Sequence, residues 1–148
     1  MSLSLRSKLT LTFDIAKALA DVAEAQVTAS GFSMFVAIVD EAGTPLHVAC
    51  HNDAQPASYE VAVAKARVAA RFRRATKAFE DRVIRDGRVN LLSLPGVVAV
   101  EGGLPLVVDG VVVGAIGVSG GTGVEDGQVA AAAVAAMPDL LGIARNSG

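Results

Sequence analysis

The chain has 148 residues, 52% of them hydrophobic and 4% aromatic, with a formal net charge of −2 at pH 7. Its length and apolar content predict one folded domain over residues 1–148 and exclude a mainly disordered chain. The small net charge gives no electrostatic case for binding nucleic acid or an anionic membrane. The chain has no apolar run of membrane-spanning length and no signal-peptide core at its N-terminus. We therefore expect a cytoplasmic protein with neither a nucleic-acid nor a membrane partner.

A helix and a β-hairpin are predicted at the start of the chain. Thr12 can cap a helix over residues 12–29, whose apolar residues recur at helical spacing, and Gly31 ends it. Residues 33–40 are apolar on both faces, which is typical of a central strand that helices cover on both sides. A turn containing Gly43 then leads into a returning strand over residues 45–51.

The returning strand carries His47, Cys50 and His51, the candidate metal or haem ligands of this sequence. Strict alternation along a strand puts both histidines on one face and Cys50 on the other, together with Leu46 and Val48. A closed zinc site needs about four ligands. We therefore predict no metal site here, and the single cysteine allows no intrachain disulfide.

Two further helices follow a loop at residues 52–57. We predict the first over residues 58–74, with Ser58 as its cap, and the second over residues 76–86. Lys65 interrupts the apolar face of the first helix, and two interpretations are open: its ammonium extends to solvent, or it points into a pocket that awaits an acid. The arginines further round this helix predict a solvated face rather than a binding patch. They are Arg67, Arg71, Arg73 and Arg74.

Three strands and a closing helix are predicted in the last third of the chain. A short strand at residues 97–100 and a strand at residues 104–108 come first. Asp109-Gly110 is the strongest hairpin signal of the sequence, and residues 111–118 return as a buried strand. The closing helix covers residues 124–137, where Pro138 breaks or kinks it.

The predicted order is therefore α-β-β-α-α-β-β-β-α. Two clear hairpins favour a sheet of about five strands that is mainly antiparallel and has helices packed on it. We classify this as an α+β fold rather than a doubly wound parallel sheet.

A glycine-rich loop joins the last predicted strand to the closing helix. Gly120, Gly121 and Gly123 permit backbone angles that other residues resist, and Thr122 and Glu125 have capping-box spacing. A strand-to-helix junction of this kind presents unpaired N–H groups at the positive end of a helix dipole. It therefore predicts a binding site for an anionic group, or else only a tight turn with nothing bound.

With these elements placed, the sequence resembles the GlcG/HbpS family, which includes the C-terminal domain of PduO-type proteins. The resemblance covers nearly the whole chain and is most specific at Glu-Gly-Gly-Leu-Pro, residues 101–105, and at residues 109–121. Supporting motifs are residues 37–40 with Gly43, Ser58 and residues 65–67. The resemblance implies a profilin-like α/β domain that forms homo-oligomers. One departure is His51-Asn52-Asp53-Ala54-Gln55, where relatives often carry Arg-Met-Asp-Gly-Ala.

The resemblance also implies haem as a possible cofactor, because some relatives bind haem and HbpS is tied to haem degradation and redox sensing. In this hypothesis the neutral imidazole of His47 or His51 ligates the iron. The chain is then a haem-binding, haem-degrading or redox-sensing module. A third hypothesis is a non-catalytic oligomeric accessory protein, in which the small-residue helices serve subunit packing.

The hypothesis that we place first is binding or turnover of a small organic acid by an isomerase, tautomerase or hydratase. The backbone N–H groups of Ser119, Gly120, Gly121, Thr122 and Gly123 would bind the acid. Lys65 would supply the cation and His51 would move the proton, while Asp53 or Glu101 would orient or share it. The predicted catalytic residues are thus His51, Lys65 and Glu101.

Overall fold

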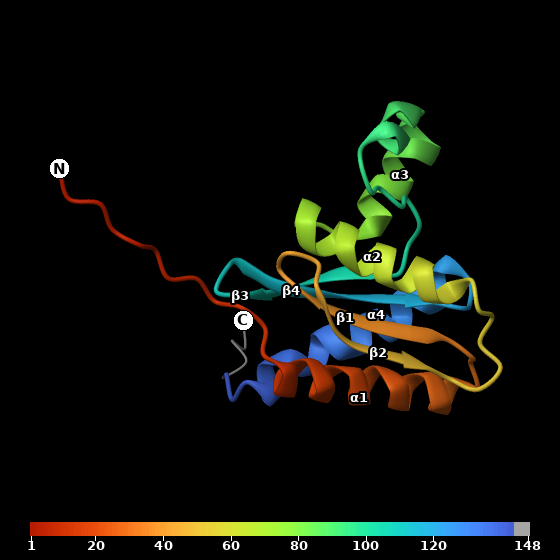
Figure 1. The fold of residues 1–148 in the computed structure, drawn as a ribbon. Coiled ribbons are helices and arrows are strands. Elements are labelled where there is room, and N and C mark those ends of the chain that lie inside the picture. The colour runs from red at the N-terminus through yellow and green to blue at the C-terminus, as the bar shows by residue number, and fades with distance from the viewer. Residues whose placement is uncertain (144–148) are drawn as a thin grey trace, which may run out of the picture.

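In the computed structural model, which describes residues 1–143, a four-stranded sheet carries α2 on one face and α1 and α4 on the other (Figure 1). The sheet order is β2-β1-β4-β3 and every neighbouring pair is antiparallel. The elements, in chain order, are α1 Phe13–Ser30, β1 Phe35–Asp40, β2 Pro45–Cys50, α2 Ser58–Phe72, α3 Thr76–Asp86, the short 3₁₀ helix η1 Val89–Ser93, β3 Gly103–Val108, β4 Val111–Ser119 and α4 Gly123–Leu140. The predicted α+β class is confirmed.

The predicted strand at residues 97–100 does not form, so the sheet has four strands instead of five. The reason lies at the neighbouring edge of β4, where the Val118 N–H donates to Gly102 O at 3.0 Å. That position beside β4 is therefore already occupied by the start of the β3 segment. Residues 97–100 instead connect η1 to this point, and Gly102, with φ of 130°, turns the chain into β3.

Local sequence signals set both ends of α1, but not the start of α2 or the end of α4. The Thr12 hydroxyl accepts the Ile15 N–H, and Gly31 ends α1 in the left-handed region with φ of 71°. The predicted cap at Ser58 is wrong, because this residue already lies inside the first turn of α2 and its hydroxyl accepts a hydrogen bond from Gln55. Pro138 lies inside the last turn of α4 and does not end the helix, which runs to residue 140.

The core has two parts, one on each face of the sheet. The larger lies between the sheet and the α1–α4 pair, and the smaller lies under α2 and consists mostly of alanine and valine. Helix α2 approaches β4 at Gly117, where a Cβ atom would lie 2.0 Å from Ala62 O and 2.5 Å from Ala66 N. Only glycine permits this distance, so the small residues of α2 and β4 let helix and sheet pack backbone to backbone.

The alternation predicted for β2 fails at Leu46. The register shifts between Ile38 and Val39, so that Val39 pairs with Pro45 and Ile38 with His47. Because of this bulge, Leu46 packs into the α1–α4 core, on the same side as His47. Val48 lies on the α2 side, opposite His47, as the alternation predicted.

The N-terminal residues form an extended arm that leads away from the body (Figure 1). The arm joins the body where the Leu11 N–H donates to Val113 O at 3.1 Å. Just before that point, the Lys8 ammonium lies 2.9 Å from the Glu41 carboxylate, and the Thr10 hydroxyl donates to the same carboxylate. Among the described residues, no helix is long and apolar enough to cross a membrane.

Candidate functional site

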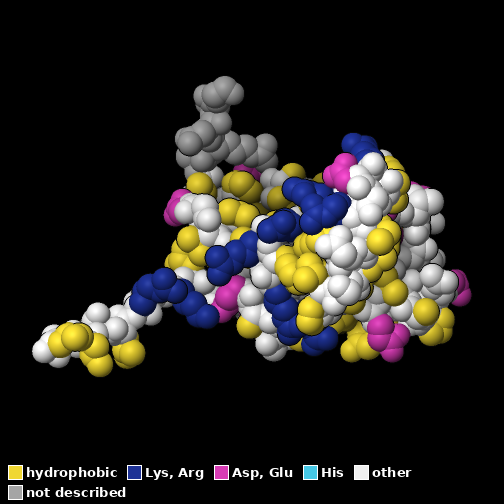
Figure 2. Space-filling view, turned by 90° about the horizontal axis from the view of Figure 1, so that it is seen from above, with side chains coloured by type: hydrophobic (Ala, Val, Ile, Leu, Met, Phe, Trp, Pro, Cys, Tyr) yellow, Lys and Arg dark blue, Asp and Glu magenta, His cyan; other side chains and the backbone are white. Residues whose placement is uncertain are grey.

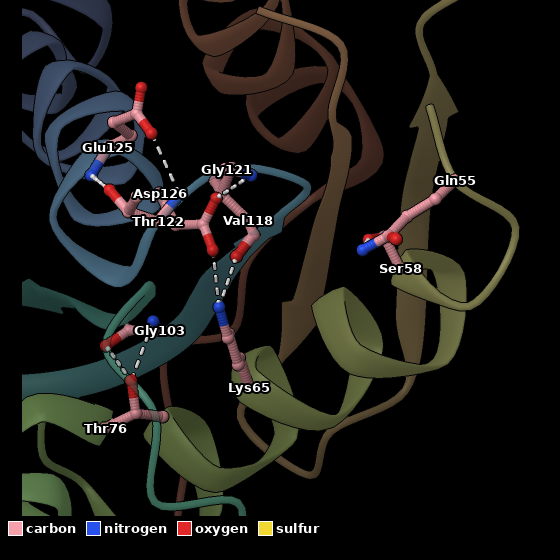
Figure 3. A network of polar contacts seen from close by, with 10 residues as sticks. All are labelled: Gln55, Ser58, Lys65, Thr76, Gly103, Val118, Gly121, Thr122, Glu125 and Asp126. Atoms are coloured by element: carbon pink, nitrogen blue, oxygen red, sulfur yellow. Dashed lines mark hydrogen bonds and ion pairs between the residues drawn. The ribbon is translucent and has the colours of Figure 1, made fainter. Parts of the chain in front are cut away.

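A buried ion pair lies at the junction of α2, β4 and α4 (Figure 3). Lys65 Nζ lies 2.7 Å from Asp126 Oδ2 and 3.0 Å from Val118 O. The side chains are almost completely buried, with 1% of Lys65 and 2% of Asp126 exposed. Lys65 therefore neither extends to solvent nor awaits a ligand, because its acid comes from the same chain.

The second oxygen of Asp126 has its own partner. Asp126 Oδ1 accepts the Gly121 N–H at 2.9 Å. Burial raises the pKa of the Asp126 carboxyl above its ordinary 3.8, while the contacts with Lys65 and Gly121 act in the opposite direction. A buried charge is tolerated when it is paired and hydrogen-bonded. Both Asp126 oxygens accept a hydrogen bond, and the Lys65 ammonium donates to Asp126 and to Val118 O.

Sequence reasoning missed Asp126, although a signal for it exists. Asp126 shares the inner face of α4 with Val129, Ala130, Ala133 and Met137, at the helical spacing that identifies a buried stripe. A carboxylate on an apolar stripe is as anomalous as the Lys65 ammonium on its own stripe. Two such anomalies of opposite charge predict a buried pair.

The Glu101-Gly102-Gly103 motif makes room for this pair. A Cβ atom on Gly102 would lie 2.8 Å from Lys65 Nζ and 2.9 Å from Asp126 Cβ. On Gly103 it would lie 2.4 Å from Lys65 O, and the Gly103 N–H donates to the buried Thr76 hydroxyl at 2.9 Å. The two glycines thus allow β3 to start directly against the ion pair.

The glycine loop has the predicted geometry at its capping box. The Glu125 N–H donates to the Thr122 hydroxyl, and the Thr122 N–H donates to the Glu125 carboxylate at 2.9 Å. Together with the Gly121 N–H, which Asp126 accepts, two amides of the predicted anion site bind carboxylates of their own helix. The positive end of the α4 dipole is therefore matched internally.

Glu101 lies beside the same helix end. Its Oε1 would be 2.6 Å from a Cβ on Gly127, and its other oxygen is 3.8 Å from the Lys77 ammonium. An anion approaching the start of α4 would therefore meet the carboxylates of Glu101 and Glu125. The structure places Glu101 near the glycine loop, but the charge there opposes an acidic ligand.

The remaining predicted site residues are spread around this end of the sheet. Ser119 ends β4 opposite Phe35 and is 6% exposed. Gly120 packs on Ser33 O, where a Cβ would lie 2.5 Å away. Gly123 opens α4. Asp53 lies in an exposed turn with φ of 65°.

The two histidines differ in how their ring nitrogens are used. His47 Nε2 is buried without a hydrogen-bond partner among the described residues, and the nearest carboxylate, that of Glu24 on α1, is 3.6 Å away. His51 Nδ1 lies 3.2 Å from Met34 O. A carbonyl can only accept, so Nδ1 carries the proton and the lone pair of His51 is on Nε2.

Two cavities of the structure lie away from the glycine loop. One of about 400 Å³ lies along α2, and one of about 730 Å³ lies between the N-terminal arm, the end of α2 and the β3–β4 hairpin. Residues 1–143 contain no group of three or more His, Cys, Asp or Glu side chains placed to hold a metal ion.

Comparison with known proteins identifies the family. The sequence model described as Haem degrading protein HbpS-like matches residues 11–135. Protein GlcG of Escherichia coli K12 is 35% identical over 115 residues, which cover 78% of this chain and 85% of GlcG.

Solved structures agree in fold. A double mutant of Streptomyces reticuli HbpS superposes with a TM-score of 0.81 at 31% identity, covering 88% of this chain and 89% of that one. A PduOC:heme complex superposes with a TM-score of 0.78 at 30% identity, covering 86% and 95%. From the fold, the glycine motifs and these matches, the chain belongs to the HbpS-like family, as its sequence motifs indicated.

Proposed function

We propose that this chain binds haem and that His51 is the axial ligand to the iron. The membership in a family described as haem-degrading, and the likeness to a structure solved as a haem complex, support haem as the ligand class. The observation that carries the choice of residue is the contact between His51 Nδ1 and Met34 O.

This contact is the one that a metal-binding imidazole needs. Histidines that ligate metals usually donate the other ring N–H to a carbonyl or carboxylate, which fixes the tautomer and the ring orientation. Met34 is fully buried and belongs to the core, so the carbonyl that orients His51 is itself held in place. The donor chemistry of His51 therefore fits a haem iron.

His47 fits less well. Its Nε2 is buried against Glu24 on the face that α1 covers, so this nitrogen would reach an external ligand only after α1 moves. Cys50 is exposed and its thiol contacts His51 O at 3.4 Å. A test of His51 must therefore also exclude the Cys50 thiol as the iron ligand.

When bound, haem supplies a redox-active iron with an axial position set by the protein. The part of this chain is to hold the imidazole of His51 in one orientation. An isomerase, tautomerase or hydratase acting on a small organic acid stays a prediction. Its support is weaker, because Lys65 and the Gly121 amide both bind Asp126.

Titration with ferric haem tests the proposal. We expect a shifted Soret band with a 1:1 end point in the unchanged protein, and its loss or an affinity at least about tenfold weaker in His51→Ala. His47→Ala and Cys50→Ser are the matched controls and should retain the spectrum. A spectrum unchanged in His51→Ala would overturn the assignment of the ligand, and no Soret shift in the unchanged protein would overturn haem binding.

A further inference from the structure

The cavity along α2 combines a cationic end with an apolar wall. It has a volume of about 400 Å³, within the range of pockets that hold small organic molecules. Val63, Ala64 and Pro45 supply apolar surface and Tyr59 an aromatic ring, while Arg67 and Arg71 supply the charge. Figure 2 shows this face of the molecule, where Lys and Arg side chains lie around an apolar patch.

The two arginines are held by the turn between β1 and β2. Arg67 Nε donates to Gly43 O at 3.1 Å, and Arg71 Nε donates to Ala42 O at 2.8 Å. A Cβ on Gly43 would lie 2.7 Å from Arg71 Nε and 3.1 Å from the Arg67 side chain, so only glycine lets both side chains lie against the turn. Each guanidinium thus uses one N–H internally, which fixes its position.

The charge of this pair is uncompensated. Among residues 1–143, neither Arg67 nor Arg71 forms an ion pair with a carboxylate. This contrasts with Lys65, whose ammonium is matched by Asp126. The residues are four apart on one helix, so their guanidiniums are neighbours and can bind the same anion.

We propose that the α2 cavity is a binding site for a small organic carboxylate with an apolar body. The carboxylate binds the free N–H groups of Arg67 and Arg71, and the body packs on Val63, Ala64 and the Tyr59 ring. Glu60 lines the same cavity, which favours a ligand with a hydrogen-bond donor at its other end. The site is separate from His51 and does not depend on haem binding.

A titration of the ¹⁵N-labelled chain with 2-naphthoate, followed by NMR, tests the site. We expect amide shifts concentrated at residues 42–43 and 59–71 of the unchanged protein. Arg67→Gln and Arg71→Gln should each weaken binding about 10- to 100-fold, the loss expected for one charge-assisted contact. The neutral analogue 2-naphthamide should bind similarly weakly to all three proteins.

Three controls make the result specific. Arg88→Gln removes an exposed arginine outside the cavity and should leave the affinity for 2-naphthoate unchanged. Ala64→Phe keeps both charges but fills the cavity, and should abolish binding. His51→Ala should bind 2-naphthoate as the unchanged protein does, whether or not haem binds. Equal affinity for 2-naphthoate and 2-naphthamide, or full binding by the Ala64→Phe variant, would overturn the proposal.

Discussion

The ammonium of Lys65 lies 2.7 Å from the carboxylate of Asp126, although 61 positions separate the two residues. They belong to helices on opposite faces of the sheet, and they meet at the end of β4 where Gly102 leaves space. The pair therefore links the two helical layers through an otherwise apolar interior.

We predict that breaking this pair destabilises the fold strongly. Lys65→Met leaves Asp126 buried without its cation, and Asp126→Asn leaves Lys65 buried without its anion. Each should lower the free energy of unfolding by about 3–5 kcal/mol, measured by urea denaturation. The double variant Lys65→Met with Asp126→Leu should recover much of the loss, because no unpaired charge remains. Single variants with the stability of the unchanged protein would contradict this account.

A second prediction concerns the titration of Asp126. Because burial raises its pKa in the folded state, the carboxyl should titrate above 3.8 when followed by NMR. The folded state then holds this proton more tightly than the unfolded state does. The stability that this group contributes is fully present below about pH 3.8 and is lost as the pH rises through the raised pKa. Lys65→Met should move the midpoint further up, and a midpoint at or below 3.8 in the unchanged protein would refute the prediction.

The third prediction concerns the N-terminal arm. Hydrogen bonds from Thr10 and Lys8 lower the pKa of Glu41 from 4.5 to about 2. The folded state therefore favours the ionised form, so the stability that this anchor contributes is present above pH 4.5 and is lost as the pH falls toward 2. Glu41→Gln should free the arm at neutral pH, and trypsin should cleave faster after Arg6 and Lys8. Asp21→Asn, which removes an exposed pair with Lys17, is the control and should leave cleavage unchanged.

The features that the sequence predicted correctly depend on neighbours in the chain. Asp109 and Gly110 both have positive φ, as a two-residue hairpin between apolar strands requires. Helix α3 has the predicted bounds of residues 76–86, and the Thr122–Glu125 capping box forms as its spacing indicated. In each case the residues that determine the structure lie within a few positions of one another.

The features that the sequence did not predict depend on contacts between residues far apart in the chain. The bulge that turns Leu46 to the α1–α4 core is set by pairing between β1 and β2. The predicted strand at residues 97–100 does not form, because Gly102 already accepts the hydrogen bond of Val118 at the edge of β4. The charge pattern of α2 predicted a solvated face, and Arg71 is exposed, but the hydrogen bonds that hold Arg67 and Arg71 against the turn at residues 42–43 were not predicted. No local pattern in the sequence reports these arrangements.

The two carboxylates at the start of α4 limit how far the glycine loop can change shape when a ligand binds. Glu125 and Asp126 supply the negative charge that the loop amides require. The amides of Gly121 and Thr122 are thus held by carboxylates of α4, and we expect this part of the loop to have the same shape in ligand-free and ligand-bound molecules. Ligand recognition then depends on side chains held by a fixed backbone, and not on closure of the glycine loop over the ligand.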